Sequence, residues 1–294
     1  MRGGSPVGAS SWRCCFASEC MNMDSRKIVF GKRNVLGVLV DACTYESATS
    51  EVILAAREGR CLGVTALAVH GLMVGRRDPV QRYRLNQLDL VVPDGQPVRW
   101  ALNLCHSAGL RNRVYGPTLM LWLCRAAADL AFPVYLYGST SVVVEELARK
   151  LQLRFPLLRI AGAEPSQFRP ITRSEKEELI QRIRASGARL TFVGLGCPRQ
   201  EVFVYESRHA LEMPVISVGA AFDYHSGFMR EPPRWVQRSG LQWAHRLIQE
   251  PRRLWKRYLL LNTGFLILLG CQLSGLWHPD PSDAEAPVGD LLLG

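Results

Sequence analysis

Short apolar runs and longer amphipathic stretches alternate along most of this chain. Runs rich in β-branched and aromatic residues predict strands, and stretches with apolar residues at helical spacing predict helices. This alternation is typical of an α/β fold with a Rossmann-like, doubly wound and mostly parallel sheet. The expected strands lie at 35–40, 60–70, 88–92, 133–137, 158–161, 190–193 and 215–218. The expected helices lie at 45–58, 71–86, 96–108, 116–131, 142–155, 175–186 and 202–211.

Glycine turns follow three of the predicted strands. They contain Gly138 with Ser139, Gly194 with Gly196, and Gly219. Ligands of parallel sheets bind outside the carboxyl ends of the strands, where glycine lets backbone N–H groups approach a phosphate or sugar. A Gly-x-Gly pattern is weak evidence by itself, so ordinary tight turns between strand and helix explain these glycines equally well.

A carboxylate follows the strand predicted at 88–92. Asp94 stands between Pro93 and Gly95, directly after the apolar run. It would lie at the same sheet edge as the glycine turns, where chemistry is expected. An Asp-Gly pair is also a common turn former, so the spacing alone leaves a catalytic and a structural interpretation open.

The C-terminal part of the chain differs in composition from the rest. The whole chain has a formal charge of +10, and residues 230–257 hold eight Arg or Lys side chains against Glu231 and Glu250. Such a segment predicts an anionic partner, which could be nucleic acid, acidic lipid or a phosphorylated substrate. No helix-turn-helix or RNP-like pattern accompanies the charge, and the basic residues adjoin an apolar stretch, so we do not expect a nucleic-acid partner.

The apolar stretch at 258–277 has no formally charged residue. It follows an amphipathic helix predicted at 235–250. Its length fits a membrane-spanning helix, but polar residues and glycines dilute it. A helix in the membrane interface and an apolar helix docked on the protein are the alternatives.

Four parts follow from these patterns: a disordered tail at 1–33, a Rossmann-like core at 34–229, a helical appendage at 230–278 and a flexible tail at 279–294. The nine cysteines include no C-x-x-C pair, and the six histidines form no spaced ligand set. This argues against a zinc site or a disulfide framework and fits a reducing compartment. The first residues lack the apolar core of a signal peptide.

Several motifs occur in order along the chain. They are V-T-A-L-A-V-H (64–70), D-L-V-V-P-D-G (89–95), R-V-Y-G-P-T-L-M (113–120), Y-G-S-T (137–140), F-V-G-L-G-C-P-R-Q-E (192–201), V-G-A-A-F-D-Y-H-S-G (218–227) and G-L-Q-W-A-H-R-L-I-Q-E-P-R-R-L-W-K-R-Y (240–258). Together they resemble the WecG/TagA/CpsF family of bacterial glycosyltransferases, over roughly residues 35–269.

The resemblance implies an inverting transfer from a UDP-sugar to an undecaprenyl-diphosphate-linked acceptor. Typical members transfer N-acetylmannosamine to N-acetylglucosaminyl-diphospho-undecaprenol, and others use N-acetylmannosaminuronic acid or glucose. It also implies a cytoplasmic protein attached peripherally to the inner face of the cell membrane. No cofactor or metal requirement is expected. An inactive membrane-bound scaffold stays an alternative, and assembly of several copies stays open.

The resemblance assigns roles to individual residues. Asp94 matches the proposed general base, and Thr65 matches the threonine of a T-x-N motif whose asparagine is replaced here by Leu67. This departure puts the sugar specificity in doubt. Further substrate-binding candidates are Arg113, Gly138, Ser139, Gly194, Gly196, Gln200, Glu201, Asp223, Arg234, Arg238, Arg246, Arg252 and Arg253. Arginines of the appendage are expected near the UDP diphosphate, with a lipid-facing basic surface as the alternative.

Overall fold

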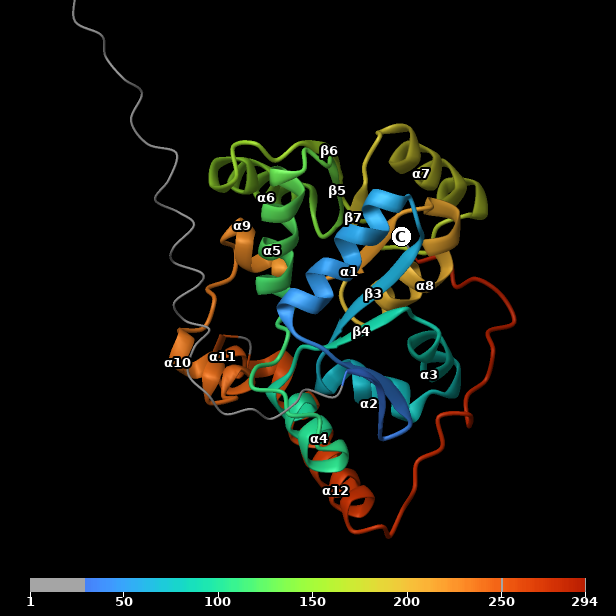
Figure 1. The fold of residues 1–294 in the computed structure, drawn as a ribbon, viewed down its shortest axis with the longest axis vertical. Helices are drawn as coiled ribbons and strands as arrows, with labels where there is room; N and C mark the ends of the chain where they lie inside the picture. The colour runs from blue at the N-terminus through green and yellow to red at the C-terminus, as the bar shows by residue number, and fades with distance from the viewer. Residues whose placement is uncertain (1–29, 250, 294) are drawn as a thin grey trace, which may run out of the picture.

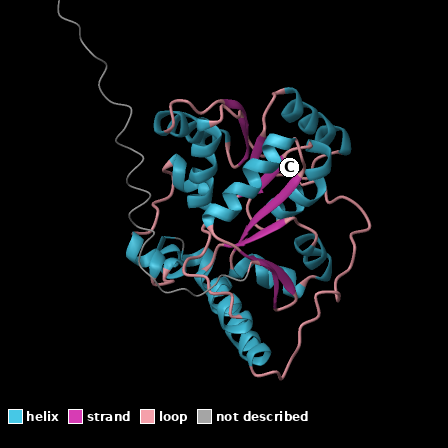
Figure 2. Cartoon of the chain, viewed as in Figure 1, coloured by secondary structure: helices cyan, strands magenta, loops and turns pink. Residues whose placement is uncertain are grey.

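In the computed structural model, which describes residues 30–249 and 251–293, six parallel strands form a sheet with helices on both faces (Figures 1 and 2). The strand order is β4-β3-β8-β7-β5-β6. The predicted α/β fold with a doubly wound parallel sheet is confirmed. Of the expected N-terminal tail, residues 1–29 lie outside the described part of the chain.

The elements follow the predicted alternation closely. The strands are β1 (Gly31–Val35), β2 (Val38–Ala42), β3 (Leu62–Leu67), β4 (Leu90–Pro93), β5 (Val134–Gly138), β6 (Ile160–Glu164), β7 (Leu190–Gly194) and β8 (Pro214–Ser217). The helices are α1 (Tyr45–Glu58), α2 (Val69–Arg77), α3 (Pro79–Asn86), α4 (Gln96–His106), α5 (Gly116–Asp129), α6 (Ser141–Arg154), α7 (Arg173–Ala185), α8 (Arg199–Leu211), α9 (Ala221–Ser226), α10 (Arg234–Arg238), α11 (Gln242–Gln249) and α12 (Pro251–Leu273).

Two apolar cores lie on the two faces of the sheet. One contains side chains of α1, α5 and α6 together with Phe192 and Phe222. The other contains side chains of α2, α3, α4, α7 and α8, and it also takes in the β1–β2 hairpin and α12. Both faces of the strands are therefore covered, which explains why their sequences read as continuous apolar runs.

The prediction of one continuous strand at 35–40 is wrong, because these residues include the turn of an antiparallel hairpin between β1 and β2. Leu36 and Gly37 both have positive φ, at 55° and 90°. The side-chain oxygen of Asn34 accepts a hydrogen bond from the Gly37 N–H at 2.8 Å and closes this turn. The ordered core consequently includes residues 31–33, which the sequence had placed in a disordered tail.

Two further local predictions need correction. Helix α7 begins at Arg173, two residues before the predicted start at 175, because Thr172 caps it through a capping box with Glu175. The single helix expected at 235–250 is broken into α10 and α11 at Gly240, whose φ is +78°. A Cβ atom on Gly240 would come within 2.9 Å of the Trp100 ring, so this break lets the appendage approach α4 closely.

The last helix, α12, is docked on the core beside α2 and α4 (Figure 1). Leu261, Phe265 and Leu269 form its buried face. The Gln272 side chain accepts from the Leu36 N–H and donates to the Asn34 carbonyl, each at 3.0 Å. Of the three alternatives for 258–277, the structure thus shows docking. Within residues 30–249 and 251–293, no helix has the length and apolar character needed to cross a membrane.

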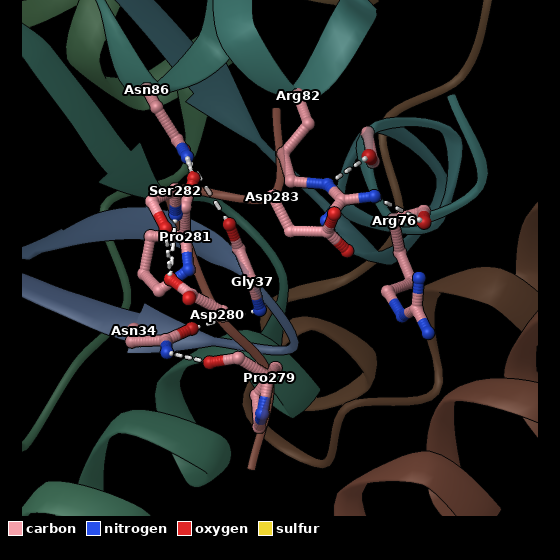
Figure 3. A network of polar contacts seen from close by, with 11 residues as sticks. Asn34, Gly37, Arg76, Arg82, Asn86, Pro279, Asp280, Pro281, Ser282 and Asp283 are labelled. Carbon is pink, nitrogen blue, oxygen red and sulfur yellow. Dashed lines mark hydrogen bonds and ion pairs between the residues drawn. The ribbon is translucent and has the colours of Figure 1, made fainter. Parts of the chain in front are cut away.

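Residues 279–283, which follow α12, make polar contacts with the β1–β2 hairpin and α3 (Figure 3). The side-chain amides of Asn34 and Asn86 donate hydrogen bonds to two proline carbonyls in this segment. Asp283 lies 3.5 Å from the Arg82 guanidinium. The segment is therefore held against the hairpin and α3.

The end of the described chain is held in the same way. Lys176 is buried, and its Nζ lies 2.8 Å from carboxylate oxygens of both Glu206 and Asp290. The Leu291 N–H donates to Glu206 at 2.8 Å. The sequence predicted a flexible tail at 279–294, and the structure differs from this prediction. The C-terminal segment contacts residues of α3, α7 and α8, which are distant in sequence, so no local pattern indicates them.

Candidate active site

A cavity of about 850 Å³ opens at the carboxyl edge of the sheet. Its walls come from the ends of β3 and β7, from the segments that follow β3, β4, β5, β7 and β8, and from residues 239–243 and α12 of the appendage. This is the position at which parallel sheets bind ligands, and the volume is that of a small-molecule site. The predicted site residues that line it are Asp94, Arg113, Ser139, Gly194, Gly196, Gln200, Glu201 and Asp223.

Asp94 lies in the turn between β4 and α4 and faces this cavity. Its N–H donates to the Leu67 carbonyl at 3.1 Å, and its Oδ1 accepts from the Gly116 N–H at 3.2 Å. Gly116 is the first residue of α5, whose N-terminus favours a negative charge. These contacts hold a carboxylate in the cavity wall, where it can accept a proton.

Arg113 brings a buried positive charge to the same cavity. The side chain is 7% exposed, and its guanidinium carbon lies 4.4 Å from the centre of the Tyr115 ring. Its buried Nη2 atom has no hydrogen-bond partner in the structure. Burial lowers the pKa of Arg99, and the charge of Arg113 lowers it further, so positive charge is concentrated here. Such a planar, partly unsatisfied cation fits a phosphate group.

Gln200 and Glu201 lie in the first turn of α8 and form the most buried polar part of the wall. The Gln200 side-chain amide donates to Glu201 Oε1 at 2.8 Å. Burial raises the pKa of Glu201, and hydrogen bonds from Gln200, Cys197 and Thr65 oppose this effect. Glu201 is therefore a carboxyl group whose surroundings favour the neutral form.

Thr65 lies behind the cavity wall and is fully buried. Its hydroxyl donates to Glu201 Oε1 at 3.4 Å and accepts from the Ser217 hydroxyl at 2.8 Å. The sequence placed Thr65 among the catalytic residues. The structure places it behind the lining, in contact with Glu201, and its predicted catalytic role stays a prediction.

The predicted glycine turns divide into two groups. Gly196 has a φ of +76°, and a Cβ atom added to it would meet nothing within 4 Å, so it leaves open space at the cavity. A Cβ on Gly138 would come within 2.6 Å of the Gly194 carbonyl oxygen, and Gly138 does not line the cavity. Ser139, in the left-handed region at φ 55°, donates its N–H to that same oxygen at 2.9 Å. Gly138 thus serves close packing of β5 against β7.

Of the predicted arginines of the appendage, the structure describes the side chain of Arg252 alone. Arg252 is exposed near the start of α12 and is absent from the described lining. The side chains of Arg234, Arg238, Arg246 and Arg253 lie outside what the structure describes. Their predicted contact with a diphosphate stays a prediction.

The structure adds cavity residues that the sequence did not single out. Tyr115 and Trp100 come from the core, and Gln242 and Trp243 come from the appendage. Gln242 also has a buried Nε2 atom without a hydrogen-bond partner. The R-V-Y-G and G-L-Q-W motifs contain Tyr115, Gln242 and Trp243. Membership of these motifs is the sequence signal that could have identified the three residues as part of the site.

Leu67 lines the cavity but is also a packing residue, only 1% exposed. Its Cδ1 would lie 2.7 Å from a Cβ on Gly71. We expect Leu67→Asn to change donor preference and to lower the free energy of unfolding by roughly 2–4 kcal/mol, because apolar packing is lost. Donor competition assays and urea denaturation measure both effects. An unchanged donor profile would show that position 67 does not contact the sugar.

The chain has an α/β fold with a cavity of small-molecule size at the carboxyl edge of a parallel sheet. The model of the family described as "Glycosyl transferase WecG/TagA/CpsF family" matches residues 33–278, so the chain belongs to this family.

Two relatives with the same name resemble the chain. It is 31% identical over 176 residues to the N-acetylglucosaminyldiphosphoundecaprenol N-acetyl-beta-D-mannosaminyltransferase of Bacillus spizizenii, covering 60% of this chain and 66% of that protein. It is 31% identical over 186 residues to the Bacillus subtilis protein of that name, covering 63% and 70%. The match spans about two thirds of these relatives.

Proposed function

We propose that the chain is an inverting glycosyltransferase that moves N-acetylmannosamine from its UDP-sugar to a polyprenyl-diphosphate-linked N-acetylglucosamine. The observation that carries this proposal is that Asp94 and the buried Arg113 both line one cavity. The names of the two relatives support the sugar and the acceptor.

Each of the two charges has a chemical task in such a transfer. Asp94 takes the proton of the acceptor hydroxyl as that oxygen attacks the anomeric carbon. Arg113 stabilises the negative charge that develops on the departing UDP diphosphate. The sugar–phosphate bond breaks as the new glycosidic bond forms on the opposite face, which inverts the anomeric centre.

A donor screen tests this function. Purified protein is incubated with lipid-diphosphate-linked N-acetylglucosamine and the UDP derivatives of N-acetylmannosamine, N-acetylmannosaminuronic acid or glucose, with and without EDTA. Mass spectrometry of the lipid product and UDP release give the rates. We expect the N-acetylmannosamine donor to react fastest and EDTA to have no effect. Absence of UDP release with every donor would favour the inactive-scaffold alternative.

We propose further that the protein works at the inner face of the cell membrane. Three apolar side chains of α12 are each more than 60% exposed: Leu259, Leu260 and Ile267. Leu266 is 63% exposed and also lines the cavity, so the opening adjoins this apolar surface. A lipid-linked acceptor could reach the cavity from a membrane on which this surface rests.

A further inference from the structure

The link between α4 and α5 is tied to Asp94 by backbone hydrogen bonds. Three consecutive N–H groups, from Val114 to Gly116, point to partners in other parts of the chain. The Val114 N–H donates to the Pro93 carbonyl at 2.9 Å, and the Gly116 N–H donates to Asp94 Oδ1 at 3.2 Å. Both of these partners lie at the end of β4. The place of the Asp94 carboxylate therefore depends on where the start of α5 lies.

The middle one of the three N–H groups belongs to Tyr115, and its partner comes from a different element. It donates to the hydroxyl oxygen of Tyr45, in α1, at 2.9 Å. Tyr115 is the N-cap residue of α5, and its own side chain makes no capping hydrogen bond. Because the first N–H groups of a helix have no partner within the helix, the Tyr45 hydroxyl and the Asp94 carboxylate cap α5 from outside.

Tyr45 is itself held firmly. It is the first residue of α1, after the Thr44 cap, and its ring stacks on Trp122 of α5 with the ring centres 5.5 Å apart. Burial raises the pKa of its hydroxyl, so the phenol is neutral near pH 7. The charge of Asp94 raises this pKa and that of Arg113 lowers it, which puts Tyr45 within electrostatic reach of both. Tyr45 is not among the described residues of the cavity lining.

A neutral hydroxyl behind the lining can hold the backbone, but it does not exchange a proton with the substrate. We propose that Tyr45 is a positioning residue for Asp94: its hydroxyl fixes the Tyr115 N–H, and with it the adjacent Gly116 N–H that holds the carboxylate. Loss of this fixed point lets the start of α5 shift, and a misplacement of about 1 Å can cost about 10²-fold in rate. The inference rests on the proposed function, in which Asp94 takes the acceptor proton.

The variant Tyr45→Phe removes the hydroxyl and keeps the ring that stacks on Trp122. With UDP-N-acetylmannosamine and the lipid-linked acceptor, we expect kcat to fall roughly tenfold while both KM values change less than about twofold, because Asp94 acts in the chemical step. Tyr135→Phe is the matched control, since it removes a hydroxyl that is hydrogen-bonded to Glu164, outside the described lining. It should leave kcat and KM unchanged. Thermal unfolding shows that each variant is folded.

A double-mutant cycle tests whether Tyr45 acts through Asp94. In the Asp94→Asn background no base is left to misplace, so adding Tyr45→Phe should lower the single-turnover rate by less than about twofold. A hydroxyl that serves only the packing of α1 on α5 would instead lower the rate by the same factor in both backgrounds.

Two results would overturn the inference and leave the proposed function intact. One is a folded Tyr45→Phe protein with the kcat of the wild type. The other is an equal loss of rate in the wild-type and Asp94→Asn backgrounds. A wild-type protein that releases no UDP from any donor would refute the proposed function and this inference with it, so the two failures are distinguishable.

Discussion

Replacement of Asp94 by asparagine is expected to lower turnover by roughly 10²- to 10⁴-fold, the usual contribution of a positioned general base. Asparagine keeps the oxygen that accepts from the Gly116 N–H, so the turn between β4 and α4 should be preserved. It cannot take a proton from the acceptor hydroxyl. UDP binding should therefore change little while the chemical step becomes slow.

Single-turnover rates and the Kd for UDP measure the two effects of Asp94→Asn separately. Asp129→Asn, at the exposed end of α5, makes the same chemical change far from the cavity and serves as the control. Turnover close to that of the wild type would remove Asp94 from the mechanism. A large rise in the UDP Kd would mean that Asp94 supports the donor site instead.

The helices and parallel strands could be predicted where their signals are local. Helix α1 occupies the predicted 45–58 because Thr44 caps its start and Gly59, in the left-handed conformation, ends it. The β1–β2 hairpin was missed because its turn, Leu36 with Gly37, lies inside an apolar run that reads as one strand. Turn geometry at a leucine leaves no trace in a hydrophobicity pattern.

The candidate site could be predicted where strand topology places it. Asp94 and Gly196 follow strands, Gly194 is the last residue of one, and parallel strands bring their carboxyl ends to one edge. Thr65 lies within β3, and one residue of register decides whether a strand side chain faces the cavity or the interior. Its neighbour Ala66 lines the cavity while Thr65 is buried.

Contacts between distant segments could not be predicted from any local pattern. Gln242 and Trp243 form part of the cavity wall only because the appendage packs against the core. The ion pairs of Lys176 with Glu206 and Asp290 join residues that are 30 and 114 positions apart. Side-chain packing and ion pairs between distant residues determine where these segments lie. Neither produces a periodic pattern in a single sequence.

The apolar surface of α12 leads to the second large expected effect. Leu261, Phe265 and Leu269 face the core, whereas Leu259, Leu260 and Ile267 lie on the opposite side of the helix and are 62%, 62% and 61% exposed. Packing against the core thus accounts for the apolar residues on only one face of α12. Basic residues at 252–257 stand at the start of the same helix, which is the arrangement of a helix resting on an anionic membrane surface.

Replacing Leu259, Leu260 and Ile267 together by glutamine should weaken binding to anionic vesicles by roughly 10²-fold or more. Each apolar side chain contributes on the order of 1.5–3 kcal/mol when fully buried, and partial burial of three still amounts to several kcal/mol. Vesicle sedimentation gives the partition coefficient. Transfer to a full-length polyprenyl acceptor in vesicles should fall by a similar factor, and transfer to a short soluble acceptor should fall little, because the cavity lining is intact. Glutamine at three exposed apolar positions around α6, Val142, Leu153 and Leu157, is the control. Equal vesicle binding by the α12 variant and the wild type would show that this surface does not meet the membrane.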